Sequence, residues 1–233
     1  MFKKIIKQII DYAIDSRLRR ETDLESRFRR IATDTTIDYI NENMRDVIYL
    51  KTTWTGLADY IIPKINQNGS ILEFGVWKGR SINHLAKRLH DKVIHGFDSF
   101  EGLPEDWKGH TNPKHTFSLE GKPPKVRKNV VLHKGWFDNT IPNFLEENKE
   151  DIALLNIDCD IYSSTHTIFE LLHSRIKKGT IIIFDEYFND LNWKEHEYKA
   201  FQEFVKKYSV NYEYLAYTSS FGCVAVNIIN ISP

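Results

Sequence analysis

The second part of the chain alternates between short apolar runs and longer amphipathic stretches. From Gly69 onward, apolar runs are followed by segments in which apolar residues recur every three or four positions. Short apolar runs are typical of buried strands, and the wider spacing is typical of helices. Their alternation predicts an α/β fold, a doubly wound and mostly parallel sheet with helices on its faces.

Seven strands and four helices are predicted in this region. We expect strands at Ser70–Phe74, Val93–Phe97, Val130–His133, Ile152–Ile157, Thr180–Phe184, Tyr212–Tyr217 and Gly222–Ile229. We expect helices at Arg80–His90, Thr140–Asn148, Ser164–Ile176 and Trp193–Lys207. The loop Thr218–Phe221 is short enough to join the last two strands as a hairpin. Five parallel strands closed by an antiparallel hairpin make a seven-stranded sheet, and a standard dinucleotide-binding fold lacks that hairpin.

Residues 1–66 are expected to form a helical extension in front of a core domain at 67–233. The first helix is predicted from a helical stripe with lysines between its members: Ile5, Ile6, Ile9, Ile10, Ala13 and Ile14. A basic amphipathic helix of this kind can lie on a membrane surface. We favour packing of the stripe on its own domain or on a partner subunit.

Three further segments complete the predicted extension. The charged stretch Arg17–Arg30 is interpreted as a solvated helix or a linker. Threonine-rich turns at 33–36 and 52–55 are expected to bracket a second helix, Ile37–Leu50, and a third helix is predicted at Gly56–Ile65. Because none of these residues suggests catalytic chemistry, we interpret the extension as a lid, a substrate wall or an oligomer contact.

Composition narrows the choice of partners and location. The 233 residues suit one large α/β domain with an added segment, and 32 basic residues balance 32 acidic ones. Such a balance gives no overall field that favours nucleic acid or anionic lipid. No apolar run reaches the roughly 18 residues of a transmembrane span, and no signal peptide is recognised, so a cytoplasmic location is predicted. Cys159 and Cys223 lie in apolar surroundings and are expected to be buried free thiols.

A glycine turn after the first predicted strand indicates a nucleotide cofactor. That strand stops at Gly75, a second glycine follows at Gly79, and a helix opens with Arg80 and Ser81. In open α/β sheets this unit binds ligands at the carboxyl end of the strand. The spacing lacks the middle glycine of the dinucleotide fingerprint. Glu73 would repel a pyrophosphate and attract the cationic methionyl end of S-adenosylmethionine, which is therefore the favoured cofactor.

Further candidates follow the next two strands. Asp98 ends its strand and is placed to bind ribose hydroxyls, although an aspartate there also suits a helix cap or an Asx turn. The proline-containing stretch Glu105–Arg127 is predicted to be a long loop that can fold over the substrate. Trp136 and Phe137 follow the third strand, where they would form either a wall against adenine or a pair of core aromatics.

Carboxylates gather where the fourth and fifth predicted strands end. If these strands are neighbours, then Asp158, Asp185 and Glu186 converge at the ligand edge of the sheet. Crowded carboxylates repel one another unless a cation or a shared proton intervenes, and hard oxygen ligands suit Mg²⁺. Such an ion would acidify and orient an acceptor hydroxyl. Asp160 is interpreted as a helix cap, and His196 is considered as a general base.

These motifs resemble the macrocin O-methyltransferase family of class I S-adenosylmethionine-dependent enzymes. The resemblance covers roughly residues 55–230 and rests on five segments: Glu73–Gly79, Gly96–Pro104, Gly135–Phe137, Asp158–Thr165 and Phe184–Tyr187. It implies Mg²⁺ ligands at Asp158, Asp185 and Glu186, where the family's usual second aspartate is a glutamate. The residues expected to contact the cofactor are Glu73, Phe74, Gly75, Val76, Gly79, Ser81, Asp98, Ser99, Trp136, Phe137 and Asp158.

The sequence thus predicts an S-adenosylmethionine-dependent O-methyltransferase. Its acceptor is expected to be a small polar molecule, a sugar or nucleotide-linked sugar of surface-polysaccharide or secondary-metabolite biosynthesis. Asp158 or His196 would take the proton. The resemblance also makes a homodimer plausible. Two alternatives stay open: a metal-independent methyltransferase with an N or phosphoryl-oxygen acceptor, and a non-catalytic, membrane-associated scaffold that binds the cofactor.

Overall fold

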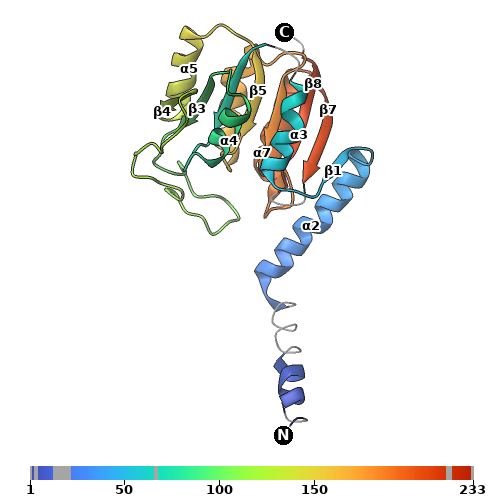
Figure 1. Cartoon of the computed structure of the whole chain (residues 1–233). Helices are drawn as coiled ribbons and strands as arrows, with labels where there is room; N and C mark the ends of the chain where they lie inside the picture. The colour runs from blue at the N-terminus through green and yellow to red at the C-terminus, as the bar shows by residue number, and fades with distance from the viewer. Residues whose placement is uncertain (1, 3–4, 13–21, 66–67, 219–221, 232–233) are drawn as a thin grey trace.

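One eight-stranded sheet runs through the part of the chain that the computed structural model describes, residues 2, 5–12, 22–65, 68–218 and 222–231 (Figure 1). Its strands, in spatial order, are β1 (Ile48–Leu50), β7 (Asn211–Thr218), β8 (Val224–Asn230), β6 (Ile181–Phe184), β5 (Ile152–Ile157), β2 (Ser70–Phe74), β3 (Ile94–Asp98) and β4 (Val130–Lys134). Strands β6, β5, β2, β3 and β4 are parallel, whereas β8 pairs antiparallel with both β6 and β7. The predicted parallel sheet with a closing hairpin is confirmed.

The expected number of strands was one too few. Strand β1 pairs in parallel with β7 at the edge of the sheet, with Ile48 opposite Ala216. The predicted helix Ile37–Leu50 is therefore wrong at its end. The preceding helix stops at Asn43, and the apolar, partly β-branched Ile48–Leu50 extends the sheet instead.

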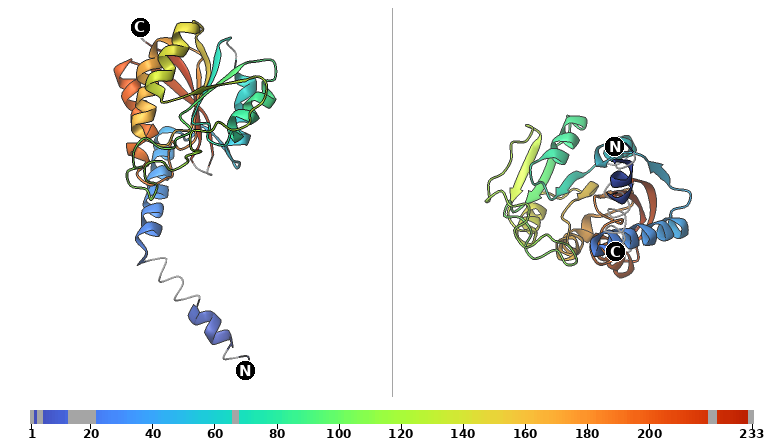
Figure 2. Two further views of the ribbon diagram at one scale, coloured as in Figure 1. Left: turned by 90° about the vertical axis from the view of Figure 1, so that its left-hand side faces the viewer. Right: turned by 90° about the horizontal axis from the view of Figure 1, so that it is seen from below.

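Helices cover both faces of the sheet, and each face has its own core (Figure 2). On one face lie α3 (Trp54–Ile61) and α4 (Arg80–Arg88), and on the other lie α5 (Phe137–Glu147), α6 (Tyr162–Leu172) and α7 (Glu197–Lys207). Side chains alternate between the two cores along a strand, because successive residues point to opposite faces. In β6, Ile183 joins the core under α3 and α4, whereas Ile182 joins the core under α6 and α7.

Short 3₁₀ turns continue some of these helices. They are η1 (Ile62–Lys64) after α3, η2 (His173–Arg175) after α6 and η3 (Trp193–Glu195) before α7. The predicted segments Gly56–Ile65, Ser164–Ile176 and Trp193–Lys207 therefore each contain a helix and a tighter turn.

Helix α2 (Leu24–Asn43) runs through the threonines that were expected to form a turn. Its N-terminus is capped by Asp23, which accepts a hydrogen bond from the Ser26 amide at 2.8 Å. The Thr33 hydroxyl donates to the Arg29 carbonyl oxygen at 3.0 Å, and the Thr35 hydroxyl to that of Ile31 at 2.9 Å. These bonds satisfy the threonine side chains within the helix, so the predicted turn at 33–36 is wrong.

The C-terminal half of α2 is fastened to the body by aromatic side chains. The Tyr39 ring lies 5.3–6.5 Å from the rings of Tyr187, Trp193, Tyr198 and Tyr214. Its hydroxyl shares a hydrogen bond of 2.5 Å with the hydroxyl of Tyr214. The N-terminal half of α2 extends away from the body (Figure 1).

The first helix, residues 5–12, lies beyond the far end of α2 (Figure 1, Figure 2). Ile5, Ile6, Ile9 and Ile10 are all exposed, so the expectation that they pack on their own domain is wrong. Ala13, Ile14 and Arg17–Glu21, which belonged to the same predictions, lie outside the described residues, as do residues 219–221 of the predicted hairpin loop.

Two other predictions can be compared with the structure. Cys159 and Cys223 are buried and not joined in a disulfide, as expected. Among the described residues, no helix has the length and apolar character needed to cross a bilayer.

Candidate active site

A cavity of about 730 Å³ opens at the carboxyl ends of β2, β3, β5 and β6. Residues that follow all four strands line it, and so do residues from the N-termini of α3, α4, α5 and α6. Ligands bind to open α/β sheets at this edge, where helix N-termini also supply unpaired amides. The predicted cofactor residues that line the cavity are Gly75, Val76, Ser81, Asp98, Ser99, Trp136, Phe137 and Asp158.

The glycine turn is shaped by positive φ angles at both predicted glycines. Gly75 has φ +89°, and a Cβ atom there would overlap the backbone carbonyl oxygen of Asp158 on the neighbouring strand. Gly79 has φ +75° and occupies the N-cap position of α4. The turn therefore lies against the end of β5, and only glycine fits at its first position.

Asp98 holds this turn from the end of β3. Its Oδ2 accepts hydrogen bonds from the amides of Val76 at 2.9 Å and Trp77 at 2.7 Å. Its Oδ1 accepts one from the Phe100 amide at 2.7 Å, which is an Asx turn. The Asx turn considered as an alternative role for Asp98 is thus present, and the same side chain also lines the cavity.

Glu73 lies beneath the turn and does not line the cavity. Its side chain is fully buried and accepts hydrogen bonds from the Ser81 hydroxyl at 2.9 Å and the Asn156 amide at 3.2 Å. Asn156 in turn accepts a hydrogen bond from the indole nitrogen of Trp54 at 2.9 Å. Burial raises the pKa of Glu73 to about 8, against the opposing effect of these hydrogen bonds. This chain of contacts links α3 to the glycine turn.

The aromatic candidates divide between core and cavity. Phe74 is buried, with its ring stacked 4.5 Å from that of Phe97 and edge-on to Phe137 at 5.1 Å. Trp136 and Phe137 line the cavity at the start of α5, whereas Phe74 does not. Trp136 and Phe137 can therefore both form a cavity wall, and Phe137 also packs against the core, so it combines the two alternatives considered.

The acidic candidates converge as predicted. Strands β5 and β6 are parallel neighbours, and the Asp185 amide donates to the Ile157 carbonyl oxygen at 3.0 Å. Asp158, Asp185 and Glu186 all line the cavity. Burial and repulsion from neighbouring carboxylates raise the pKa of Asp158 and of Glu186 well above the usual range. Burial also raises the pKa of Asp185, whose Oδ1 accepts a hydrogen bond from the Cys223 thiol at 3.1 Å.

Asp160 belongs to this acidic cluster, and its interpretation as a helix cap is wrong. Helix α6 has Ile161 at its N-cap and no side-chain cap there. Asp160 instead has φ +65° and lines the cavity together with Glu186. Burial raises its pKa to about 7. The sequence could have shown that Asp160 belongs to the acidic cluster, because it follows the same strand as Asp158, two residues later.

Glu197 is an acidic residue that the sequence analysis missed. It is fully buried at the start of α7, and its Oε2 accepts a hydrogen bond from the Glu186 amide at 3.3 Å. Two buried oxygens among the described residues, Oε1 of Glu197 and Oε2 of Glu186, have no hydrogen-bond partner. The sequence did contain a sign of the burial of Glu197. This acid lies three, four and seven residues before Ala200, Phe201 and Phe204, and therefore on the apolar face of the predicted helix.

The donor set is hard oxygen, which suits Mg²⁺ rather than a softer ion. Within the described ranges, however, no three His, Cys, Asp or Glu side chains are grouped so as to hold a metal ion. The acidic cluster therefore has the chemistry of a divalent-cation site without a preformed coordination shell.

His196 is held away from the cavity wall by the long loop after β3. Its Nε2 donates to the Lys108 carbonyl oxygen at 3.1 Å, and its ring lies 6.0 Å from that of Trp107. Burial lowers its pKa to about 4, so the imidazole is neutral at physiological pH. His196 is not among the cavity-lining residues, and its contacts are those of a residue that positions the loop.

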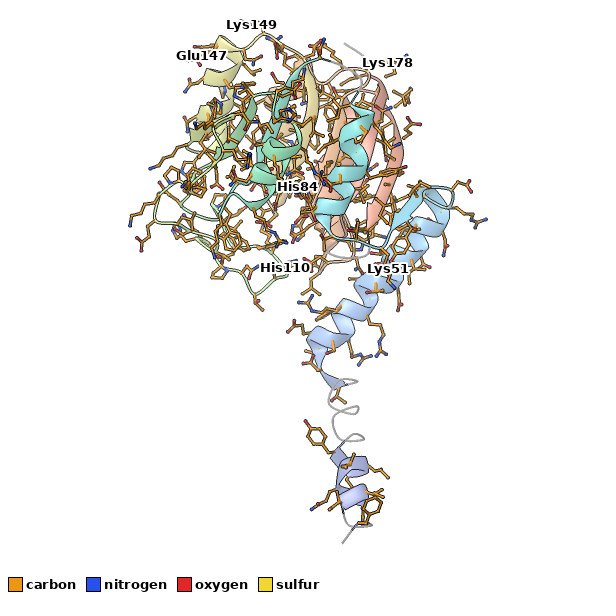
Figure 3. All side chains as sticks on the ribbon, in the orientation of Figure 1. Lys51, His84, His110, Glu147, Lys149 and Lys178 are labelled. Atoms are coloured by element: carbon orange, nitrogen blue, oxygen red, sulfur yellow. The ribbon has the colours of Figure 1, made fainter. Side chains whose placement is uncertain are left out.

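The segment after β3 lines part of the cavity, and the role of the predicted loop Glu105–Arg127 over a substrate stays a prediction. Leu103, Pro104 and Phe117 line the cavity, and the Phe117 ring meets the Trp77 ring edge-on at 5.5 Å. The Ser163 hydroxyl on α6 donates to Glu105 at 2.6 Å. Figure 3 labels His110, which lies in this loop at the end of the body nearest α2.

The helical extension also contributes to the cavity. Thr53, Trp54 and Thr55 line it at the N-terminus of α3, where the sequence analysis placed only a turn. The role of residues 1–66 as a lid, a substrate wall or an oligomer contact stays a prediction, although the start of α3 lies at the cavity.

The mostly parallel sheet with its closing hairpin, and the glycine turn and acidic cluster at its carboxyl edge, are those of a class I methyltransferase fold. In agreement, residues 72–187 match the family described as "Methyltransferase domain". The chain carries that domain over about half of its length. The narrower resemblance to macrocin O-methyltransferases stays a prediction.

Two curated relatives are O-methyltransferases from Streptomyces species. The chain is 26% identical over 145 residues to demethyldecarbamoylnovobiocin O-methyltransferase of Streptomyces niveus, covering 52% of this chain and 54% of the relative. It is 29% identical over 144 residues to a tetracenomycin rhamnosyl 4'-O-methyltransferase of Streptomyces olivaceus, covering 51% and 53%. The matches thus span about half the length of each relative.

A solved structure extends the similarity in fold. A calicheamicin methyltransferase superimposes with a TM-score of 0.60 at 23% identity, covering 74% of this chain and 77% of that one. At this identity the comparison supports the architecture, while the acceptor has to be argued from the site.

Proposed function

We propose that this chain is an S-adenosylmethionine-dependent O-methyltransferase acting on a hydroxyl of a small polar acceptor. The single observation that carries the proposal is the cavity in which the glycine turn and the acidic cluster face the same space. We infer a sugar or nucleotide-linked sugar as acceptor, in surface-polysaccharide or secondary-metabolite biosynthesis. The sugar-directed activity in the name of one curated relative supports this choice.

The glycine turn, Asp98 and the aromatics of α5 form the cofactor side of the proposed site. Bound S-adenosylmethionine would supply an electrophilic methyl group on a sulfonium. Gly75 lets the backbone approach the cofactor closely, whereas Gly79, which does not line the cavity, shapes the start of α4. Asp98 can accept hydrogen bonds from ribose hydroxyls. Trp136 and Phe137 offer apolar faces to adenine. Glu73 would not contact the cofactor directly. It accepts a hydrogen bond from Ser81, which lines the cavity, and so would position that side chain.

The acidic cluster forms the acceptor side. We propose that Asp158, Asp185 and Glu186 hold Mg²⁺, for which the hard oxygen donors and the unpartnered Oε2 of Glu186 are the support. The ion would lower the pKa of an acceptor hydroxyl and orient it. Of the carboxylates that line the cavity, Asp158 and Asp160 are the ones proposed to accept the hydroxyl proton. They replace His196 in that role, because its Nε2 already donates to the loop.

Substitution at Asp185 tests the proposal. Asp185→Asn should lower kcat at least about 100-fold, as removal of a metal ligand or general base does. The affinity for S-adenosylhomocysteine, measured by calorimetry, should change less than about threefold, because Asp98 and the glycine turn are untouched. Asp151→Asn, at the other end of β5, is the matched control. Wild-type turnover by Asp185→Asn on sugar nucleotides would reject the assignment.

A metal-independent methyltransferase acting on an N or phosphoryl-oxygen acceptor is the second candidate. It is favoured by one observation, namely that no three acidic side chains among the described residues form a metal-binding group. Turnover that survives exhaustive chelation, with no heat of Mn²⁺ binding, would establish it. Loss of turnover on chelation, restored by Mg²⁺, would establish the first.

We also propose a cytoplasmic homodimer. Leu24, Phe28 and Ile31 are exposed on α2 at spacings of four and three residues, so they form one apolar stripe. The two buried cysteines, which are not joined in a disulfide, suit a reducing compartment. Multi-angle light scattering should give twice the chain mass for the wild type, and the mass of one chain for Phe28→Glu.

A further inference from the structure

The described part of the first helix, residues 5–12 together with Phe2, carries six of the seventeen large apolar side chains that are exposed in the structure. They are Phe2, Ile5, Ile6, Ile9, Ile10 and Tyr12, with exposures from 43% to 79%. The other eleven are spread over α2 and the body, where the stripe Leu24, Phe28 and Ile31 is a smaller group. A contiguous group of six such residues marks an interaction surface.

The apolar residues share one face of the helix. At 100° per residue, all six fall within an arc of about 160°, while Lys7, Gln8 and Asp11 occupy the remainder. This is the pattern of an amphipathic helix that lies in the plane of a membrane interface. Figures 1 and 2 show no other described segment beside this helix, so its apolar face is open.

Charge selects the partner. Residues 1–30 contain nine Lys and Arg against five Asp and Glu, a net charge of +4. The other 203 residues contain 23 basic and 27 acidic residues, a net charge of −4. The balance of the whole chain therefore conceals a basic arm on an acidic body. Anionic lipid attracts a basic arm and repels an acidic body.

We propose that Phe2 and the helix at residues 5–12 bind the surface of an anionic bilayer, with the isoleucine face inserted at the headgroup boundary. The body would then be held at the membrane by α2, with its cavity open to small molecules. This inference concerns a surface far from the cavity and does not rest on the proposed activity.

A second copy of the chain is the competing occupant. The dimer proposed above uses the stripe on α2 and does not require the first helix. Pairing residues 2–12 of two copies would bring two net charges of +2 side by side, which is unfavourable at low salt. Docking on the body of another copy would require an apolar groove. The second cavity described on the body is lined in part by Glu170, Glu203, Lys206 and Lys207, which does not suit an isoleucine face.

The test is co-sedimentation of the full chain with vesicles. Binding to phosphatidylcholine vesicles containing one quarter phosphatidylglycerol should exceed binding to pure phosphatidylcholine at least about tenfold, because each basic residue adds to the attraction. Ile9→Asp should lower binding to the anionic vesicles at least about tenfold. Gln8→Asp adds the same charge on the polar face and should lower it less than about threefold.

Three results would overturn the proposal: no binding to either kind of vesicle, equal loss in the two variants, or loss of self-association in Ile9→Asp without vesicle binding. The last would assign the surface to a second copy. Because residues 5–12 do not contact the body, both variants should retain the wild-type thermal midpoint, which separates loss of binding from misfolding.

Discussion

Gly75 and Gly79 allow a matched test of how the glycine turn is built. Both have positive φ angles, +89° and +75°, so alanine at either position is strained by about 1–2 kcal/mol. The space around them differs. At Gly79 the nearest atom to an added Cβ is the side-chain nitrogen of Asn83 at 3.3 Å, which can move aside.

At Gly75 the added Cβ would overlap the backbone carbonyl oxygen of Asp158, which cannot move without shifting β5. Two backbone hydrogen bonds hold the strands there, from Gly75 to Phe97 at 3.0 Å and from Asp158 to Phe74 at 2.9 Å. Weakening both costs about 1 kcal/mol each, in addition to the φ strain. We therefore expect Gly75→Ala to cost about 3–4 kcal/mol and Gly79→Ala about 1–2 kcal/mol.

Urea unfolding followed by tryptophan fluorescence gives both free energies, provided that the transitions are two-state and the slopes agree. Calorimetric titration with S-adenosylhomocysteine tests the same geometry in the folded protein, where Gly75→Ala should lose more affinity. Equal destabilisation by the two substitutions, or a larger effect at Gly79, would refute the packing of the turn against Asp158.

Three further predictions concern other parts of the molecule. The pKa of Glu73 rises from 4.5 to about 8 on folding, so its contribution favours the fold at low pH and is lost as pH rises through this window. Between pH 5 and 8 the free energy of unfolding should therefore fall less in Glu73→Gln than in the wild type. The difference between the two falls should be about 4 kcal/mol, measured by urea unfolding at several pH values. Ser163→Ala removes the hydrogen bond to Glu105 that holds the loop over the cavity. It should raise KM for the acceptor about three- to fivefold in steady-state kinetics, with Ser174→Ala as control. An unchanged KM would show that this bond does not hold the loop. Tyr39→Ala should cost about 2–4 kcal/mol by urea unfolding because it removes four ring contacts and a hydroxyl bond, whereas Tyr12→Ala, an exposed tyrosine, should cost less than about 0.5 kcal/mol.

The buried strands were predictable because their side chains face packed helices on both sides. Ser70–Phe74 and Ile152–Ile157 are apolar runs with few alternatives, and their observed bounds equal the predicted ones. Strand β1 was missed because three residues at the edge of a sheet carry too little periodicity to be told from a helix end.

The site was predictable where a residue ends a strand. Asp98, Asp158 and Asp185 each follow a recognisable apolar run, and all three line the cavity. Glu197 and Thr53 could not be assigned this way, because helices whose placement depends on tertiary packing bring them to the site. The expected turn at Thr33–Thr36 failed for a local reason, since threonine hydroxyls can bond within a helix as well as end one.

The hydrogen bonds from Trp54 through Asn156 to Glu73 have a consequence for shortening the chain. Asn156 is fully buried on β5, and its side-chain oxygen accepts a hydrogen bond from the indole N–H of Trp54 on α3. A shorter chain that begins at residue 67 would lack α3 and would uncover that face of the sheet. The side-chain oxygen of Asn156 would then have lost its hydrogen-bond donor, at a cost of about 1–3 kcal/mol. The smallest unit that keeps its interior satisfied must therefore start ahead of Trp54.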